Sequence, residues 1–121
     1  MNRFVITASS VALVATTFVG CTDNASSDDA TKVAVTSSND TCELSATEAA
    51  AGTIVFTVKN DGDNTTEFYV LEEDGETIVN EVEDIGPGLT RDMTIDVETG
   101  TYVTRCEPSG GEEVTDSFTV N

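Results

Sequence analysis

The feature that most constrains this fold is a period-two alternation of apolar and polar residues, which recurs in short runs from Thr31 onward. In the run "GTIVFTVKN", one face carries Ile54, Phe56 and Val58, and "LTRDMTIDVETG" alternates in the same way. The turn signals "NDGDN", "EDGE" and "GPG" separate the runs, and no convincing amphipathic helix occurs. This pattern predicts an all-β, Greek-key β-sandwich of seven to eight strands over residues 31–121.

Residues 1–20 are predicted to be a targeting signal. Arg3 is followed by an uncharged stretch that is short for a membrane span and diluted by Ser and Thr. The stretch ends in "FVGC", which resembles the lipobox of bacterial lipoproteins, so we expect cleavage before Cys21 and lipidation of that cysteine. The alternative is an ordinary signal peptide next to an unmodified cysteine. Residues 21–30 are polar and acidic, and they predict a flexible tether.

The net charge of the chain argues against some classes of binding partner. Asp and Glu number 23 against 5 Lys and Arg, which gives a formal net charge of −18. Such a charge argues against binding nucleic acid or anionic lipid headgroups. We therefore expect membrane contact only through the lipid anchor, and most of the carboxylates to be solvated.

Two cysteines remain after Cys21 is assigned to the lipid. Cys42 and Cys106 form an even pair in a chain expected to be exported, which favours a structural disulfide. The alternative is a pair of free thiolates that ligate a metal. The residues alone leave both readings open.

Two local patterns resemble the cupredoxin fold of the blue copper proteins: "GTYVTRCEP", and "VKNDG" followed by "TTEFYV". The resemblance implies a metal-ligating cysteine at Cys106 and histidine ligands near Ser109 and near Thr66 or Glu67. The chain contains no histidine, so a type 1 copper centre with two histidines and a cysteine is excluded by composition.

A closer resemblance covers residues 31–121. The segments "CELSATEAAAGTIVFTVKNDGDNTTEFYVL" and "EVEDIGPGLTRDMTIDVETGTYVTRCEP" are similar to the N-terminal cupredoxin-like domain of EfeO-type iron-uptake proteins. This resemblance implies an extracytoplasmic domain that binds iron or copper through cysteine and acidic residues. It also implies partners in an iron-permease system, such as a separate peptidase-M75-like protein.

Carried over residue by residue, the resemblance implies Cys42, Glu67 and Cys106 as metal ligands. Glu107 joins them because it adjoins the cysteine. Gly110 stands where the family is expected to have a methionine, which argues against a thioether ligand for Cu(I).

The leading hypothesis is therefore a lipid-anchored, extracytoplasmic metal-binding module of a metal-uptake system. The alternative is a disulfide-pinned structural or interaction domain that docks a partner protein without binding metal. We expect no enzymatic activity, because no catalytic triad, nucleophile elbow or phosphate-binding loop occurs.

Overall fold

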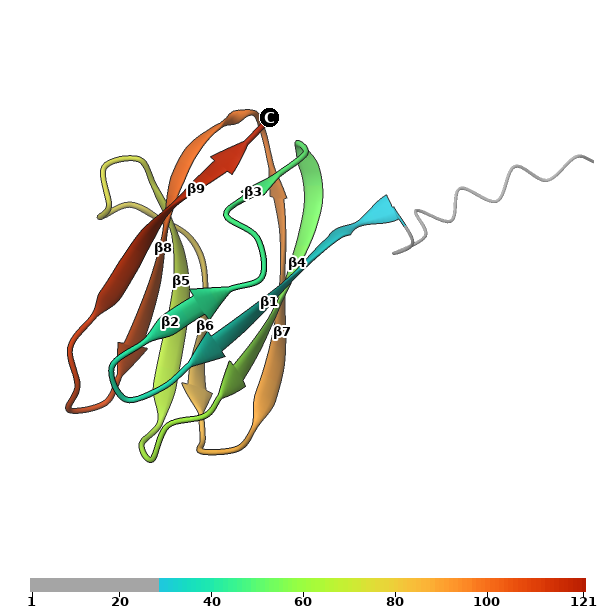
Figure 1. The fold of residues 1–121 in the computed structure, drawn as a ribbon. Coiled ribbons are helices and arrows are strands. Elements are labelled where there is room, and N and C mark those ends of the chain that lie inside the picture. Colours follow the sequence, from blue (N-terminus) through green and yellow to red (C-terminus); the bar gives the residue numbers. More distant parts are fainter. Residues whose placement is uncertain (1–28) are drawn as a thin grey trace, which may run out of the picture.

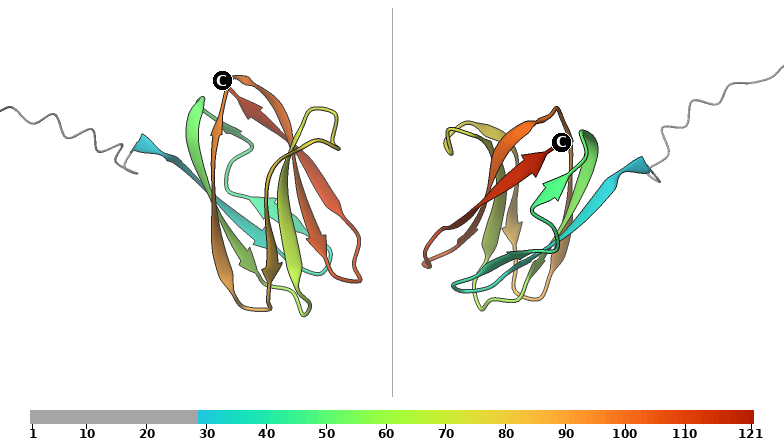
Figure 2. Two further views of the ribbon diagram at one scale, coloured as in Figure 1. Left: turned by 180° about the vertical axis from the view of Figure 1, so that it is seen from behind. Right: turned by 45° about the horizontal axis from the view of Figure 1, so that its top comes forward.

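Nine strands make up the regular structure of residues 29–121, the part of the chain that the computed structural model describes (Figure 1). The strands are β1 (Thr31–Ser37), β2 (Cys42–Leu44), β3 (Glu48–Ala49), β4 (Gly52–Asn60), β5 (Thr66–Glu72), β6 (Ile78–Ile85), β7 (Thr90–Val97), β8 (Gly100–Pro108) and β9 (Val114–Val120). They form a four-stranded sheet in the order β2-β1-β4-β7 and a five-stranded sheet in the order β3-β9-β8-β5-β6. Figure 2 shows the two sheets facing each other.

The two sheets are mixed, because β1 runs parallel to β4 and β3 runs parallel to β9, while the other pairs are antiparallel. The all-β sandwich predicted from the alternation is confirmed. The count is nine rather than seven to eight because the chain between β1 and β4 contributes two short strands, one to each sheet. The segment "TIVNEVEDI", expected as an irregular strand or a connection, contains β6.

The apolar faces of both sheets meet in one core. Phe56 of β4 packs against Phe68 of β5 and Phe118 of β9, with ring centroids 5.3 and 5.4 Å apart. All three rings are essentially inaccessible to solvent. Burial of such large apolar side chains is the main favourable term for a domain of this size.

The loops at one end of the sandwich, residues 38–41, 61–65, 86–89 and 109–113, are called the distal end here, because β1 begins and the chain ends at the other end (Figure 1). The buried Asn60 ties two of these loops together. Its Nδ2 donates to the carbonyls of Asn64 and Ile85, each at 2.7 Å. Its Oδ1 accepts from the Gly62 N–H at 2.8 Å. These bonds satisfy the amide in a place that water does not reach.

The predicted signal, Cys21 and the tether up to residue 28 lie outside the described residues. Within residues 29–121, no helix is long and apolar enough to cross a membrane.

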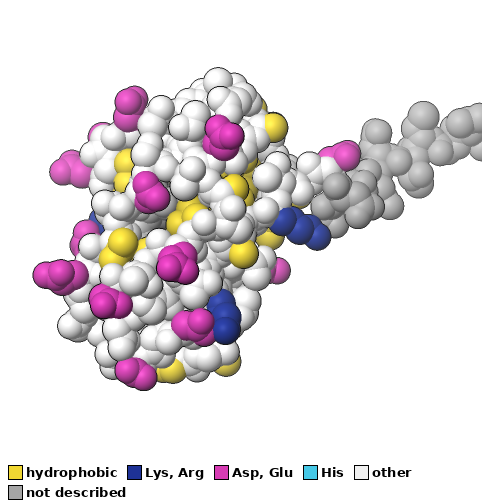
Figure 3. Space-filling view, in the orientation of Figure 1, with side chains coloured by type: hydrophobic (Ala, Val, Ile, Leu, Met, Phe, Trp, Pro, Cys, Tyr) yellow, Lys and Arg dark blue, Asp and Glu magenta, His cyan; other side chains and the backbone are white. Residues whose placement is uncertain are grey.

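Among the charged side chains on the face shown in Figure 3, Asp and Glu (magenta) outnumber Lys and Arg (dark blue). With a net charge of −18, repulsion between these groups opposes the compact state. Salt shortens the range of this repulsion from about 30 Å at 0.01 M to about 3 Å at 1 M.

We therefore predict that the free energy of unfolding rises by on the order of 1 kcal/mol or more between these two NaCl concentrations. Urea denaturation at each concentration measures it. The variant Glu81→Gln/Glu83→Gln is the control, because it undergoes the same non-electrostatic salt effects with less repulsion, and its free energy should rise less. An unfolding free energy that stays flat or falls with salt would contradict the prediction.

Candidate functional site

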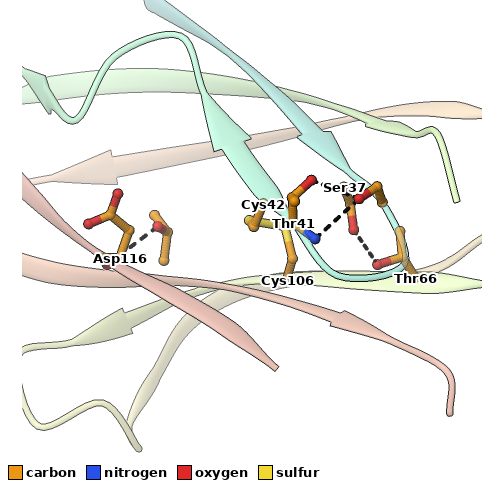
Figure 4. Close-up of a disulfide and its surroundings, with 8 residues drawn as sticks. Ser37, Thr41, Cys42, Thr66, Cys106 and Asp116 are labelled. Carbon is orange, nitrogen blue, oxygen red and sulfur yellow. Dashed lines mark hydrogen bonds between the residues drawn. A yellow bond between two sulfur atoms is a disulfide. The ribbon is translucent and has the colours of Figure 1, made fainter. Parts of the chain in front are cut away.

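The two cysteines of the described chain are bonded to each other. Cys42 of β2 and Cys106 of β8 form a disulfide with their Cα atoms 5.7 Å apart (Figure 4). Because β2 and β8 belong to different sheets, the bridge links the two layers near the distal end. Cys106 is fully buried and Cys42 is partly buried. Neither sulfur is a thiolate in this state, so neither has the form that ligates a metal.

A pair of hydroxyl groups lies beside the bridge (Figure 4). The Ser37 and Thr66 hydroxyls share a hydrogen bond of 2.7 Å, and both residues are buried. Thr66 is one of the two residues at which the cupredoxin resemblance places a histidine ligand. Each hydroxyl therefore already has a partner within the protein.

The residues near the bridge do not fit a type 1 copper ion. The Cys106 sulfur is bonded to Cys42, and the chain has no histidine to supply the nitrogen ligands. Ser109, at the expected place of the loop histidine, is exposed, and its backbone N–H donates to the Thr65 carbonyl at 2.8 Å. Gly110 adopts a φ of 75°, a conformation that glycine tolerates better than any other residue.

The two predicted carboxylate ligands lie on the other side of the same sheet. Glu67 of β5 is the direct cross-strand partner of Glu107 of β8, while the next pair in the register is Phe68 and Cys106. Because successive side chains of a strand point to opposite faces, the sulfur faces the core and both carboxylates face outward. The structure thus brings Glu67 and Glu107 together and separates this pair from the two sulfurs.

Tyr69 and Arg105 organise this outward face. They are cross-strand partners, and the Arg105 guanidinium carbon lies 4.4 Å from the centre of the Tyr69 ring. The Tyr69 hydroxyl donates to the Glu67 carboxylate. Arg105 Nε lies 3.6 Å from a Glu107 carboxylate oxygen, and Arg105 Nη1 lies 3.7 Å from one of Glu113. The Arg105 guanidinium therefore contacts an aromatic ring and two carboxylates.

Repulsion between carboxylates extends to the neighbouring strand, β6. Glu81 of β6 is the other cross-strand partner of Tyr69. Repulsion from Glu81, and then from Glu67, raises the pKa of Glu83. We call Glu67, Glu81, Glu83 and Glu107 the acidic face.

Sequence reasoning named only two members of the acidic face and missed Tyr69 and Arg105. Each of these stands two residues from a predicted carboxylate, the spacing that puts strand residues on one face.

No group of three or more His, Cys, Asp or Glu side chains arranged to hold a metal ion occurs within residues 29–121.

Comparison with known proteins agrees with this architecture. The sequence matches the family described as "Cupredoxin-like domain" over residues 10–111, and the chain belongs to that family. No curated protein matches the chain.

Two solved structures share the fold. Reduced auracyanin from the photosynthetic bacterium Roseiflexus castenholzii is 20% identical, with a TM-score of 0.59 over 75% of this chain and 97% of that one. Auracyanin A, a "blue" copper protein from Chloroflexus aurantiacus, is 16% identical, with a TM-score of 0.56 over 76% of this chain and 99% of that one. At this identity the likeness establishes the fold alone, and the EfeO-type assignment stays a prediction.

The bridge generates a stability prediction. Replacing both cysteines by alanine removes a cross-link between residues 64 positions apart, which in the chain-entropy model lowers the free energy of unfolding by about 4 kcal/mol. Urea denaturation in 1 M NaCl measures the loss, because about 1 M salt screens the surface repulsion. A thiol reductant should lower the wild-type value towards that of the variant and leave the variant unchanged. Equal stability of the two proteins without reductant would contradict a formed bridge.

The Tyr69–Glu67 contact generates a titration prediction. The hydrogen bond to Glu67, then burial, then the surrounding carboxylates raise the pKa of Tyr69 above its ordinary value of about 10. Glu67→Ala removes the hydrogen bond and one charge, so the pKa of Tyr69 should fall towards that ordinary value.

The chain has only two tyrosines, so both proteins are compared in a Tyr102→Phe background, where phenolate absorbance reports Tyr69 alone. Because the pKa is raised in the folded state, its stabilising effect is full below the ordinary value and is lost as the pH rises through the folded value. Identical titration curves for the two proteins would show that Glu67 does not contact the hydroxyl.

Proposed function

We propose that this chain is an extracytoplasmic interaction domain, in which the disulfide pins the sandwich and the acidic face docks a basic partner protein. One observation carries the proposal. The sulfur of Cys106 is bonded to Cys42 and buried, while the carboxylates of Glu67 and Glu107 stand on the opposite side of the sheet. The cysteine–carboxylate ligand set inferred from the resemblance therefore does not converge, and the sheet presents its carboxylates outward instead.

Electrostatics supports a cationic partner. Like charges directly opposite each other destabilise a sheet, and Glu67 and Glu107 are such a cross-strand pair, with Arg105 Nε 3.6 Å from Glu107. Repulsion from Glu81 and then Glu67 raises the pKa of Glu83, in keeping with an excess of negative charge on this face. Lys and Arg side chains from a partner would relieve this repulsion, and complementary charge also speeds association. An acidic partner or nucleic acid would be repelled.

The arrangement also suits a lipid-anchored protein. If Cys21 carries the lipid, the tether of residues 21–30 could span about 30 Å if fully extended, and it joins β1 at the end opposite the distal loops. The distal end would then point away from the membrane, and the acidic face would stand along the side of the domain. We place the protein with an iron-uptake or copper-uptake system, where a peptidase-M75-like protein is the proposed partner.

A second candidate function is the capture of a hard metal ion by the paired carboxylates. The cross-strand register of Glu67 and Glu107 favours it, because oxygen ligands suit ferric iron and similar cations. Two carboxylates leave most of the coordination sphere to water, so this site would be weak and open. It involves neither cysteine.

The docking proposal predicts a localised response to a basic probe. A short Lys/Arg-rich peptide is titrated into isotope-labelled protein at 0.15 M salt, where the screening length is about 8 Å, and amide chemical shifts are followed. Shifts should concentrate on β5, β6 and β8. Glu67→Gln/Glu107→Gln should weaken binding about tenfold, equivalent to about 1.4 kcal/mol.

The matched control is Glu43→Gln/Asp92→Asn, which removes the same charge from exposed positions on the other sheet. It should leave the affinity within about twofold, a change of about 0.4 kcal/mol. Shifts spread evenly over both sheets, or equal losses in the two variants, would sink the docking proposal and leave only bulk charge.

The same variants test metal capture. Ferric, cupric and zinc ions are titrated separately into the oxidised protein at the same salt concentration. Binding lost in Glu67→Gln/Glu107→Gln and kept in the control would support the carboxylate site. Weak, salt-sensitive binding that is equal in all three proteins would reject it.

A further inference from the structure

We propose that Asn64 is an acceptor for an N-linked glycan, added by an oligosaccharyltransferase outside the cytoplasm. The segment Asn64-Thr65-Thr66 has the Asn-x-Thr form that such enzymes require, where x is not proline. This inference is independent of the docking proposal, because it concerns the distal loops and not the acidic face.

A second segment of the same form lies nearby. Asn39-Asp40-Thr41 is in the loop between β1 and β2, and Asn64 is in the loop between β4 and β5. The two loops touch at the distal end, because Asn39 bonds to Asp63, the neighbour of Asn64. The structure therefore offers two candidate acceptors in similar surroundings, and their side chains can be compared.

The side chain of Asn39 is engaged in holding the loops together. Its Nδ2 donates to the Asp63 carboxylate at 2.9 Å, and its Oδ1 accepts from the Asp63 backbone N–H at 2.8 Å. A Cβ atom at Gly62 would come within 2.8 Å of Asn39 Oδ1, so the packing there is close. A sugar on Asn39 Nδ2 would compete with the bond to Asp63 and crowd this contact.

The side chain of Asn64 has no such task within the described residues. Asn64 is exposed, and only its backbone carbonyl is used, as an acceptor from the buried Asn60. A glycan on its Nδ2 would extend into solvent and break no hydrogen bond of the folded domain. Asn64 is therefore the acceptor whose glycan the finished fold tolerates, whereas a glycan on Asn39 would hinder folding, so the folded protein should carry its sugar on Asn64.

The burial of Thr66 determines when the modification can occur. In the folded domain Thr66 is 1% exposed, and its hydroxyl is bonded to Ser37. An oligosaccharyltransferase needs access to this hydroxyl, so it must act before β5 joins the sandwich, while the exported chain is still unfolded. Once the fold forms, the recognition threonine is inside and the modified asparagine is outside.

The chemistry is a group transfer from a polyprenyl-phosphate-linked or pyrophosphate-linked oligosaccharide. Asn64 Nδ2 forms a bond to the anomeric carbon of the first sugar, and the anomeric carbon–oxygen bond to phosphate breaks. The phosphate or pyrophosphate leaves with the electron pair, and a base of the transferase takes the amide proton. The finished glycan would cover the distal loops and leave the sides of both sheets open.

The test is glycopeptide mass spectrometry of the full chain purified from the membranes of the cells that produce it. After reduction, trypsin places the two candidates on different peptides, Asn39 within residues 33–59 and Asn64 within residues 60–91. We expect a sugar mass on the second peptide, its loss in Asn64→Gln and its persistence in Asn39→Gln. Thr66→Ser keeps the hydroxyl and should keep the glycan.

Recovery of the 60–91 peptide in unmodified form only would overturn the proposal. A glycan found on the 33–59 peptide alone would overturn it as well, because it would reverse the order of preference derived from the side-chain contacts. Asn64→Gln changes an exposed side chain without a hydrogen bond, so the variant should fold, and its thermal unfolding midpoint serves as the check.

Discussion

The disulfide between Cys42 and Cys106 is the interaction on which the distal half of the sandwich depends. Strand β2 has only three residues and pairs with β1 alone, so its hydrogen bonds cannot by themselves fix the segment between β1 and β4. The bridge anchors that segment to β8, in the centre of the other sheet. It thereby holds the loop that carries Asn39 near the loop that carries Asp63, to which Asn39 bonds, and it lies beside the buried Ser37–Thr66 pair (Figure 4).

The alternation of side chains explains why the inferred metal site divides into two parts. Cys106 and Glu107 are neighbours in one strand, so they point to opposite faces of the sheet, and the same holds for Glu67 and Phe68. An inward sulfur and an outward carboxylate from adjacent positions cannot meet at one ion without a bulge in the strand. The pairing of β5 with β8 runs without a register shift from Thr66 to Glu72. The inward side chains of this sheet therefore pack in the core, and its carboxylates lie on the outward face.

Much of this was predictable from the sequence, and the remainder depended on contacts between distant segments. The clean alternation in β4 and β7 predicted both strands, whereas β6 was hard to recognise because two register shifts against β5 interrupt its pattern. The opposite orientations of Cys106 and Glu107 could have been inferred from strand periodicity, but the predicted ligand set assigned both residues to one metal ion. Whether Cys106 meets Cys42 depends on how two sheets are stacked, which no local pattern encodes. The contact of Arg105 with Tyr69 likewise required the register of β5 against β8.

The bridge and the surface charge affect the free energy of unfolding in different ways. Together they set the salt concentrations at which the domain stays folded. Repulsion among the carboxylates weakens as salt screens it, whereas a covalent link is indifferent to ionic strength. The bridge is therefore most important at low ionic strength, where repulsion is strongest and the free energy of unfolding of this small domain is lowest. Because Cys106 is buried, an external thiol can approach only the partly buried Cys42, and attack there would release a thiolate into an apolar core. That outcome is unfavourable, so the bridge resists reduction while the domain is folded and is reached by a thiol once the chain unfolds. The exposed carboxylates, by contrast, respond to salt and pH.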